Sequence, residues 1–106
     1  MKIILLTAGI LALAATPSLA NDPAEGRKVA ARCQTCHGLD GIARLPIAPN
    51  LAGESAVYLK TQIEAYRSGA RENAMMSVVV KDLTDQQIAD VAAWYESIEI
   101  TAKMPE

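Results

Sequence analysis

Residues 32–40 read RCQTCHGLD and contain every cysteine and histidine of the 106-residue chain. Cys33 and Cys36 are its two cysteines, and His37 is its single histidine. Thiolates and imidazoles are the side chains that most readily bind transition metals. The chemistry of this short cluster therefore has to be identified from the rest of the sequence.

Several kinds of Cys and His site fit the cluster poorly. A structural zinc site needs four such ligands and a catalytic site needs three plus water, but the chain has three in total and two of them are adjacent. A thioredoxin-like dithiol begins a helix in a strand-containing fold, and no strand pattern precedes Cys33. A disulfide between Cys33 and Cys36 remains open in an oxidising compartment, although it would close only a very small loop.

Covalent haem attachment explains the spacing directly, because C-x-x-C-H is the signature of this linkage. Two cysteines three positions apart on a helical turn can each form a thioether with one haem vinyl group. The adjacent His37 then faces the iron as an axial ligand. The motif predicts one haem c with its iron, bound through Cys33, Cys36 and His37.

A second axial ligand has to come from methionine, because the chain has no other histidine. Met104 lies beside Pro105 in a C-terminal tail and is a poor candidate. Met75 and Met76 follow a short irregular stretch from which the chain can return over the other face of the haem. Methionine opposite histidine raises the reduction potential and suits one-electron transfer. The residues alone leave Met75 and Met76 both open.

The first 20 residues have the layout of a secretory signal peptide, with one lysine, an apolar run and a break at Pro17. Ser18 and Ala20 are the small residues that precede a cut after position 20. An uncleaved membrane anchor is the alternative, because the apolar stretch is almost long enough to span a bilayer. We expect cleavage, no stable membrane insertion afterwards, and a periplasmic domain of residues 21–106.

The charge of this domain excludes one class of function. Nine Lys and Arg stand against twelve Asp and Glu, a formal charge of −3, whereas nucleic-acid binding needs a net basic face. Residues 27–71 hold seven basic against three acidic residues, and residues 81–106 hold two against six. Such a dipole can steer a partner protein, although solvated helix faces of opposite sign also explain it.

Helix signals recur along the domain, and no strand-like alternation is present. Capping residues, an N-terminal proline and terminal glycines predict three main helices. The apolar residues along one face of the last helix form a stripe that should be buried. The three helices cover residues 22–38, 55–69 and 84–98, and the stripe consists of Ile88, Val91, Ala92, Tyr95 and Ile98, with Trp94 at its flank.

Two other segments have less regular patterns. Residues 38–53 are rich in glycine and proline and predict a long loop, which in a small domain usually wraps a ligand. Residues 71–82 predict a loop with a helical turn or a short helix. The chain has no Phe, one Trp and three Tyr, so something other than aromatic side chains should fill the centre of this all-α domain.

Taken in order, these segments resemble a small bacterial class I cytochrome c. The resemblance covers nearly all of residues 22–98 and includes CQTCHG, PNLAG, YLKTQIEAYRSG, the MM pair and LTDQQIADVAAWY. It implies three main helices, short helical segments and a long loop around a covalently bound haem. It also implies that the first and last helices cross, with small residues such as Gly26 and Ala30 against Trp94 and Tyr95.

The resemblance implies roles for two further residues. In this family the ligand methionine lies eight residues before the Ser or Thr that caps the last helix. This position corresponds to Met76, with Met75 as the alternative. The family's proline, whose carbonyl accepts from the ring N–H of the proximal histidine, corresponds to Pro49; Pro46 is a weaker match. Such a bond fixes the ring and tunes the iron.

The resemblance also implies an electron carrier rather than an enzyme. One-electron transfer would connect periplasmic redox proteins, such as a dehydrogenase, an oxidase or a membrane cytochrome complex. The alternative is a haem subunit of a periplasmic dehydrogenase complex, for example a flavocytochrome c sulfide dehydrogenase. A sensory or catalytic haem protein without a sixth ligand is a third possibility. Four basic residues near the motif favour an acidic docking surface: Arg27, Lys28, Arg32 and Arg44.

Overall fold

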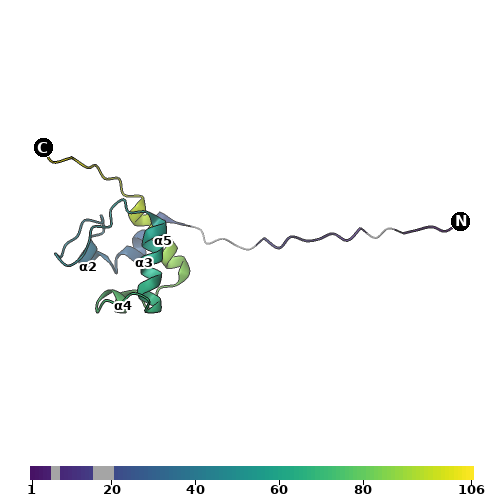
Figure 1. The fold of residues 1–106 in the computed structure, drawn as a ribbon, viewed down its shortest axis with the longest axis horizontal. Helices are drawn as coiled ribbons and strands as arrows, with labels where there is room; N and C mark the ends of the chain where they lie inside the picture. The colour runs from purple at the N-terminus through teal and green to yellow at the C-terminus, as the bar shows by residue number, and fades with distance from the viewer. Residues whose placement is uncertain (6–7, 16–20) are drawn as a thin grey trace.

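The computed structural model describes residues 1–5, 8–15 and 21–106. These residues form helices and no strand, which confirms the all-α prediction. Figure 1 shows the helices gathered in one body, from which the N-terminal stretch extends. The helices are α1 (Pro23–Ala30), α2 (Gln34–His37), α3 (Ala56–Ser68), α4 (Met76–Val79) and α5 (Asp85–Glu96).

The N-terminal stretch carries the predicted leader. Residues 1–5 and 8–15 are exposed and form neither helix nor strand. Within the described ranges, no helix has the length and apolar character needed to cross a membrane. The predicted cleavage signals at Pro17, Ser18 and Ala20 lie outside the described residues.

The first predicted helix is interrupted before the cysteines. After α1 the chain makes a tighter turn, in which the Arg32 N–H donates to the Val29 carbonyl at 3.0 Å and the Cys33 N–H donates to the Ala30 carbonyl at 2.9 Å. These three-residue spacings are those of a 3₁₀ turn, and α2 then begins at Gln34. The prediction of one continuous helix was wrong here, because no glycine or proline marks the turn in the sequence.

α1 crosses α5 at very close range, and Gly26 makes this possible. A Cβ atom at position 26 would overlap the backbone carbonyl of Asp90 and meet the Cβ of Trp94. The predicted close approach of the first and last helices at small residues is therefore confirmed. Asp22 caps α1 by accepting from the Ala24 N–H at 2.9 Å.

Both ends of α3 and the start of α5 are as predicted, whereas α5 ends at Glu96, two residues before its predicted end. The Ser55 hydroxyl accepts from the Tyr58 N–H at the start of α3, and Gly69 ends this helix with a φ of 84°. At the start of α5, Thr84 and Gln87 form the predicted capping box. Residues 71–82, for which the sequence predicts a loop with a helical turn or a short helix, contain the short helix α4.

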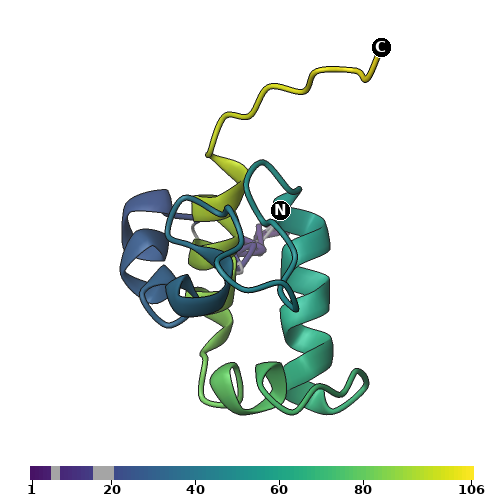
Figure 2. The same ribbon diagram turned by 90° about the vertical axis from the view of Figure 1, so that its left-hand side faces the viewer.

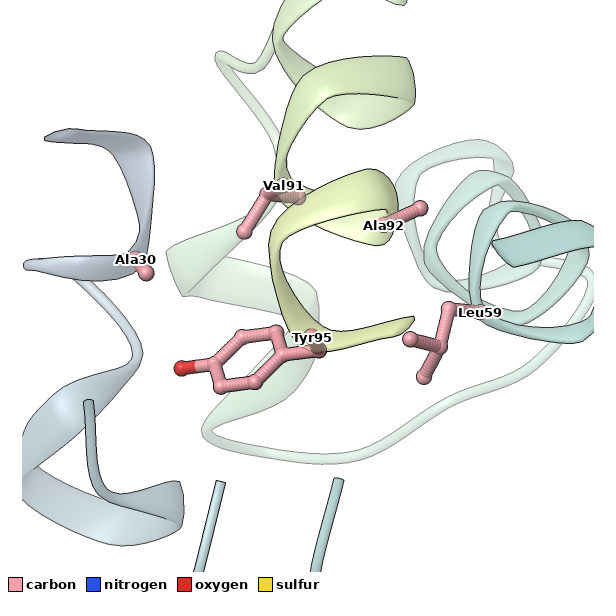
Figure 3. Close-up of a cluster of buried hydrophobic side chains, with 5 residues drawn as sticks. All are labelled: Ala30, Leu59, Val91, Ala92 and Tyr95. Carbon is pink, nitrogen blue, oxygen red and sulfur yellow. The ribbon is translucent and has the colours of Figure 1, made fainter. Parts of the chain in front are cut away.

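Two clusters of buried side chains hold these helices together. In the first, α5 lies between α1 and α3, and Figure 3 shows its side chains pointing to both. The second joins α4 to the start of α5, and Met76 packs against it. Four positions of the predicted α5 stripe are buried and Ile98 is partly buried. The clusters consist of Ala30, Leu59, Val91, Ala92 and Tyr95, and of Val80, Leu83 and Ile88.

The long loop of residues 38–53 connects the two sides of the molecule. Figure 2 shows α1 and α2 (blue) on one side of α5 and α3 (teal) on the other, with this loop passing between them. None of its residues lies in a helix, as predicted. The loop starts directly after His37, so its course decides what surrounds that side chain.

Candidate functional site

The two cysteines flank the start of α2. Cys33 immediately precedes the helix and Cys36 lies within it; both are free and partly buried. The disulfide considered from the sequence is therefore not formed. Cys33 packs against the first cluster, and burial raises the pKa of its thiol to about 11. Both sulfur atoms are thus available for covalent attachment.

His37 ends the same helix and is 7% exposed. Its Nδ1 lies 2.9 Å from the carbonyl oxygen of Pro49. A carbonyl only accepts hydrogen bonds, so Nδ1 is the donor in this contact, and Nε2 is the ring nitrogen left to bind iron. Within the described part of the chain, Nε2 forms no hydrogen bond. Every fully buried side-chain N or O atom there does have a hydrogen-bond partner, so Nε2 is not fully buried. Nε2 therefore faces accessible space, as an iron ligand must.

The Pro49 carbonyl is held in place by contacts across the loop. The Arg44 N–H donates to the Cys36 carbonyl at 2.8 Å, which folds the loop back onto α2. The Asn50 side chain accepts from the Ala43 N–H, also at 2.8 Å. Sequence reasoning did not select Asn50, although an Asn beside Pro is a common turn signal.

Two aromatic side chains of α5 fix the backbone that follows His37. The Tyr95 hydroxyl donates to the Gly38 carbonyl at 3.0 Å, and the Trp94 indole N–H donates to the Leu39 carbonyl at 2.9 Å. The Tyr95 carbonyl also accepts from the Gly53 N–H at 2.9 Å. Burial raises the pKa of Tyr95, so its hydroxyl stays a donor. The sequence pattern predicted the packing of these residues but not their polar contacts.

The methionine pair lies at the start of α4. Met75 is 46% exposed, whereas Met76 is partly buried and packs against the second cluster. The Asn73 side chain accepts from both methionine N–H groups at 3.0 Å, a contact that sequence reasoning missed. The two thioethers therefore have different surroundings. Met104 is 82% exposed in a tail without helix.

The basic residues near the cysteines are all exposed but are not all unpaired. Lys28 lies 2.7 Å from Glu25, and Arg44 lies 3.1 Å from Asp40. The guanidinium of Arg27 lies 5.9 Å from the centre of the Trp94 ring. Half of the predicted basic charge is thus balanced by neighbouring carboxylates.

The donor set of this region fits a covalently attached haem. Two free thiols and an accessible imidazole nitrogen lie within five residues, and thioethers are the remaining soft donors. In the described ranges, no three His, Cys, Asp or Glu side chains gather as a metal cluster. Thioether links to the cysteines and axial bonds from His and Met would use this set fully.

Comparison with known proteins agrees with this geometry. The family model described as Cytochrome c matches residues 23–99. The chain is 46% identical over 83 residues to cytochrome c-554(548) of Halomonas halodenitrificans, covering 76% of this chain and all of that one. It is 38% identical over 99 residues to a thiosulfate dehydrogenase electron acceptor of Thiomonas intermedia, covering 92% of this chain and 43% of that one.

A solved structure shows the same architecture. The crystal structure of reduced recombinant cytochrome c4 from Pseudomonas stutzeri superposes with a TM-score of 0.70 at 31% identity. The match covers 76% of this chain and 47% of the other. The chain thus spans the whole of one relative and less than half of the other two.

Proposed function

The chain belongs to the cytochrome c family, whose members transfer electrons through covalently bound haem c, and we propose that Cys33, Cys36 and His37 hold the haem of this protein. The observation that carries the proposal is the contact between His37 Nδ1 and the Pro49 carbonyl. It directs Nε2 into accessible space, and the two free thiols lie within four residues of His37 in the sequence. Pro49 would hold the ring and raise the basicity of the iron ligand.

Met76 is the proposed second axial ligand. It precedes the α5 cap Thr84 by eight residues, and its side chain is partly enclosed by the second cluster. Met75 is more exposed, which suits a residue that does not have to exclude water from the iron. A buried thioether ligand raises the reduction potential.

The residues of this chain then perform one-electron transfer. A haem bound by these residues would supply a one-electron ferrous–ferric couple. His37 and Met76 would both bind its iron, so no position would be left for a substrate. The Pro49 carbonyl, which accepts from His37, and the donors Tyr95 and Trp94 restrict movement of the His37 segment. Little rearrangement is then needed when the charge changes.

The proposed place of action is the periplasm, after removal of residues 1–20. The partners would be periplasmic redox proteins: a dehydrogenase, an oxidase or a membrane cytochrome complex. The relative described as a thiosulfate dehydrogenase electron acceptor favours a dehydrogenase as donor. A permanent haem subunit of such a dehydrogenase is the second candidate. Size-exclusion chromatography of the native protein separates a free carrier from a subunit.

Optical spectra test the ligand assignment. The protein would be exported from a host that attaches c-type haem, and its ferric and ferrous forms compared. A weak far-red band of the ferric form reports a methionine–iron bond. We expect Met76→Ala to abolish it and Met75→Ala to retain it. Retention in Met76→Ala would overturn the ligand assignment, and a protein without haem absorption would overturn the proposed function.

A further inference from the structure

Asp90 is a buried carboxylate outside the haem site. It lies on α5 where α1 crosses it and is 6% exposed. Its Oδ1 accepts from the Asp22 backbone N–H and from the Gln86 side-chain amide, both at 2.9 Å. No described side chain forms an ion pair with it. Buried carboxylates are rarely found without a cation or metal partner, so a cation is expected close to Asp90.

The start of the domain can provide this cation. A cut after position 20 turns the amide nitrogen of Asn21 into a free α-ammonium group. Standard bond lengths keep the nitrogens of consecutive residues within about 3.6 Å of each other. Because Asp22 N lies 2.9 Å from Asp90 Oδ1, the Asn21 nitrogen lies within about 6.5 Å of that oxygen whatever its torsion angles.

We propose that removal of the leader creates an ion pair between the new α-ammonium group of Asn21 and the buried carboxylate of Asp90. The pair would tie the start of α1 to α5 and make the processed domain more stable than the unprocessed chain. The inference rests on the proposed cleavage after position 20. It does not depend on which residues bind the haem.

Other charges near this point also act on the ammonium group. On the α1 side these are the Asp22 carboxylate, which caps the helix, and Glu25, which pairs with Lys28. On the α5 side it is Asp90, since Gln86 is neutral. The positive end of the α1 dipole opposes the ammonium group. A test has to separate the effect of Asp90 on the ammonium group from the effects of these other charges, which are the same in every variant.

A cycle of four haem-loaded proteins makes this separation. Two of the proteins begin at Asn21, one with Asp90 and one with Asp90→Asn. The other two have the same residues at position 90 but carry a Gly-Ser extension before Asn21, which moves the ammonium group away. Asn keeps an oxygen that can accept from the Asp22 N–H and from Gln86, so only the charge is removed. Intact mass identifies the first residue, and guanidinium unfolding at pH 6 and pH 9.5 gives the unfolding equilibrium constant.

We expect the extension to raise the unfolding equilibrium constant of the Asp90 protein roughly fivefold at pH 6. In Asp90→Asn the extension should have only the smaller effect of the remaining charges, so the difference between the two backgrounds measures the Asp90 contribution. Pairing raises the pKa of the amine in the folded state above its usual value of about 7.7–8.0. The stabilisation is therefore complete below that range and is lost as the pH rises through the folded-state pKa. At pH 9.5 the effect of the extension should be much smaller.

Two results would overturn the inference. An equal effect of the extension in both backgrounds would show that Asp90 is not the partner, and an effect that does not change with pH would show that the ammonium charge is not involved. A mass that shows another first residue would overturn the proposed cleavage and the ion pair together. Haem spectra of the four proteins report the proposed function separately, so its failure is distinguishable.

Discussion

The segment around His37 and the segment around Met76 are held by different kinds of contact. His37 contacts a carbonyl 12 residues away, and α5 side chains 57 and 55 residues away fix the next two residues. The side chain of Met76 packs against the second cluster, but the hydrogen bonds of its segment are local. Asn73 accepts from both methionine N–H groups, and its carbonyl accepts from the Ser77 N–H at 2.9 Å.

This difference has a consequence for local stability. Contacts between distant segments break only when the helices separate, whereas a locally built turn can open by itself. We therefore expect the histidine side to open with the free energy of global unfolding. The methionine side should open at a lower free energy, so the two proposed axial ligands would differ in how easily they are lost.

The largest effect on the free energy of unfolding is expected from Gly26→Ala, which disrupts the crossing of α1 and α5 that supports the histidine side. The new Cβ would overlap the Asp90 carbonyl, so α1 and α5 must move apart. We expect a loss of about 3 kcal/mol in the free energy of unfolding. Gly69→Ala at the end of α3 is the control: it meets no atom within 4 Å and suffers only its positive φ, about 1 kcal/mol. Equal losses in urea unfolding would contradict the close crossing.

Tyr95→Phe should have the next largest effect. The substitution keeps the ring in the first cluster but removes the donor to the Gly38 carbonyl. That carbonyl retains the Gly41 N–H at 3.2 Å, so we expect a loss of about 1–1.5 kcal/mol in urea unfolding. Tyr58→Phe, at a half-exposed position of α3, should change the free energy of unfolding very little. If both variants behaved alike, the hydroxyl would not support the histidine side.

Asn73→Ala tests the methionine side. It removes the acceptor for the N–H groups of Met75 and Met76, with an expected loss of about 1 kcal/mol confined to α4. Hydrogen exchange should become faster at the α4 amides and stay unchanged at the His37 amide. Faster exchange on both sides would show that the two segments open together and not separately.

The smallest effect is expected for Asp40→Asn, in the loop next to the histidine side. The Ile42 N–H and then Arg44 bond to the Asp40 carboxylate and lower its pKa. A lowered folded-state pKa gives stability that is present above the unfolded value of about 3.9 and is lost as the pH falls through the folded value. The variant should flatten the acid side of the stability–pH curve. The free energy of unfolding of the variant should be lower than that of the parent at pH 7. The two values should approach each other near pH 2.

The sequence predicted those parts of the fold that have local chemical signals. Ser55 and the Thr84–Gln87 box cap helices through contacts within three residues, and Gly69 ends α3 with its positive φ, so their patterns can be read directly. The turn before Cys33 lacks such a signal, because its i→i−3 bonds use backbone groups that every residue carries. The sequence therefore predicts one long helix here.

The candidate site was predictable to a similar extent. The cysteines, His37 and the methionine pair are rare side chains whose spacing carries chemical information. The contacts of Tyr95 and Trp94 with the loop carbonyls join residues more than 50 positions apart, and only the folded chain brings them together. Their hydrophobic periodicity predicted where they are buried but not where their polar atoms point.

Tyr95 has one more consequence, which concerns how this domain can change over time. Its hydroxyl and its carbonyl hold residues 38 and 53, the two ends of the same loop. With both ends fixed by one residue of α5, doubling the loop length costs only about 0.6 kcal/mol in closure entropy. Insertions and replacements in the exposed residues 44–47 can therefore accumulate while Pro49 and the helices stay as they are. Variants that exchange these exposed residues should acquire new surfaces beside the proposed haem attachment segment without a new fold.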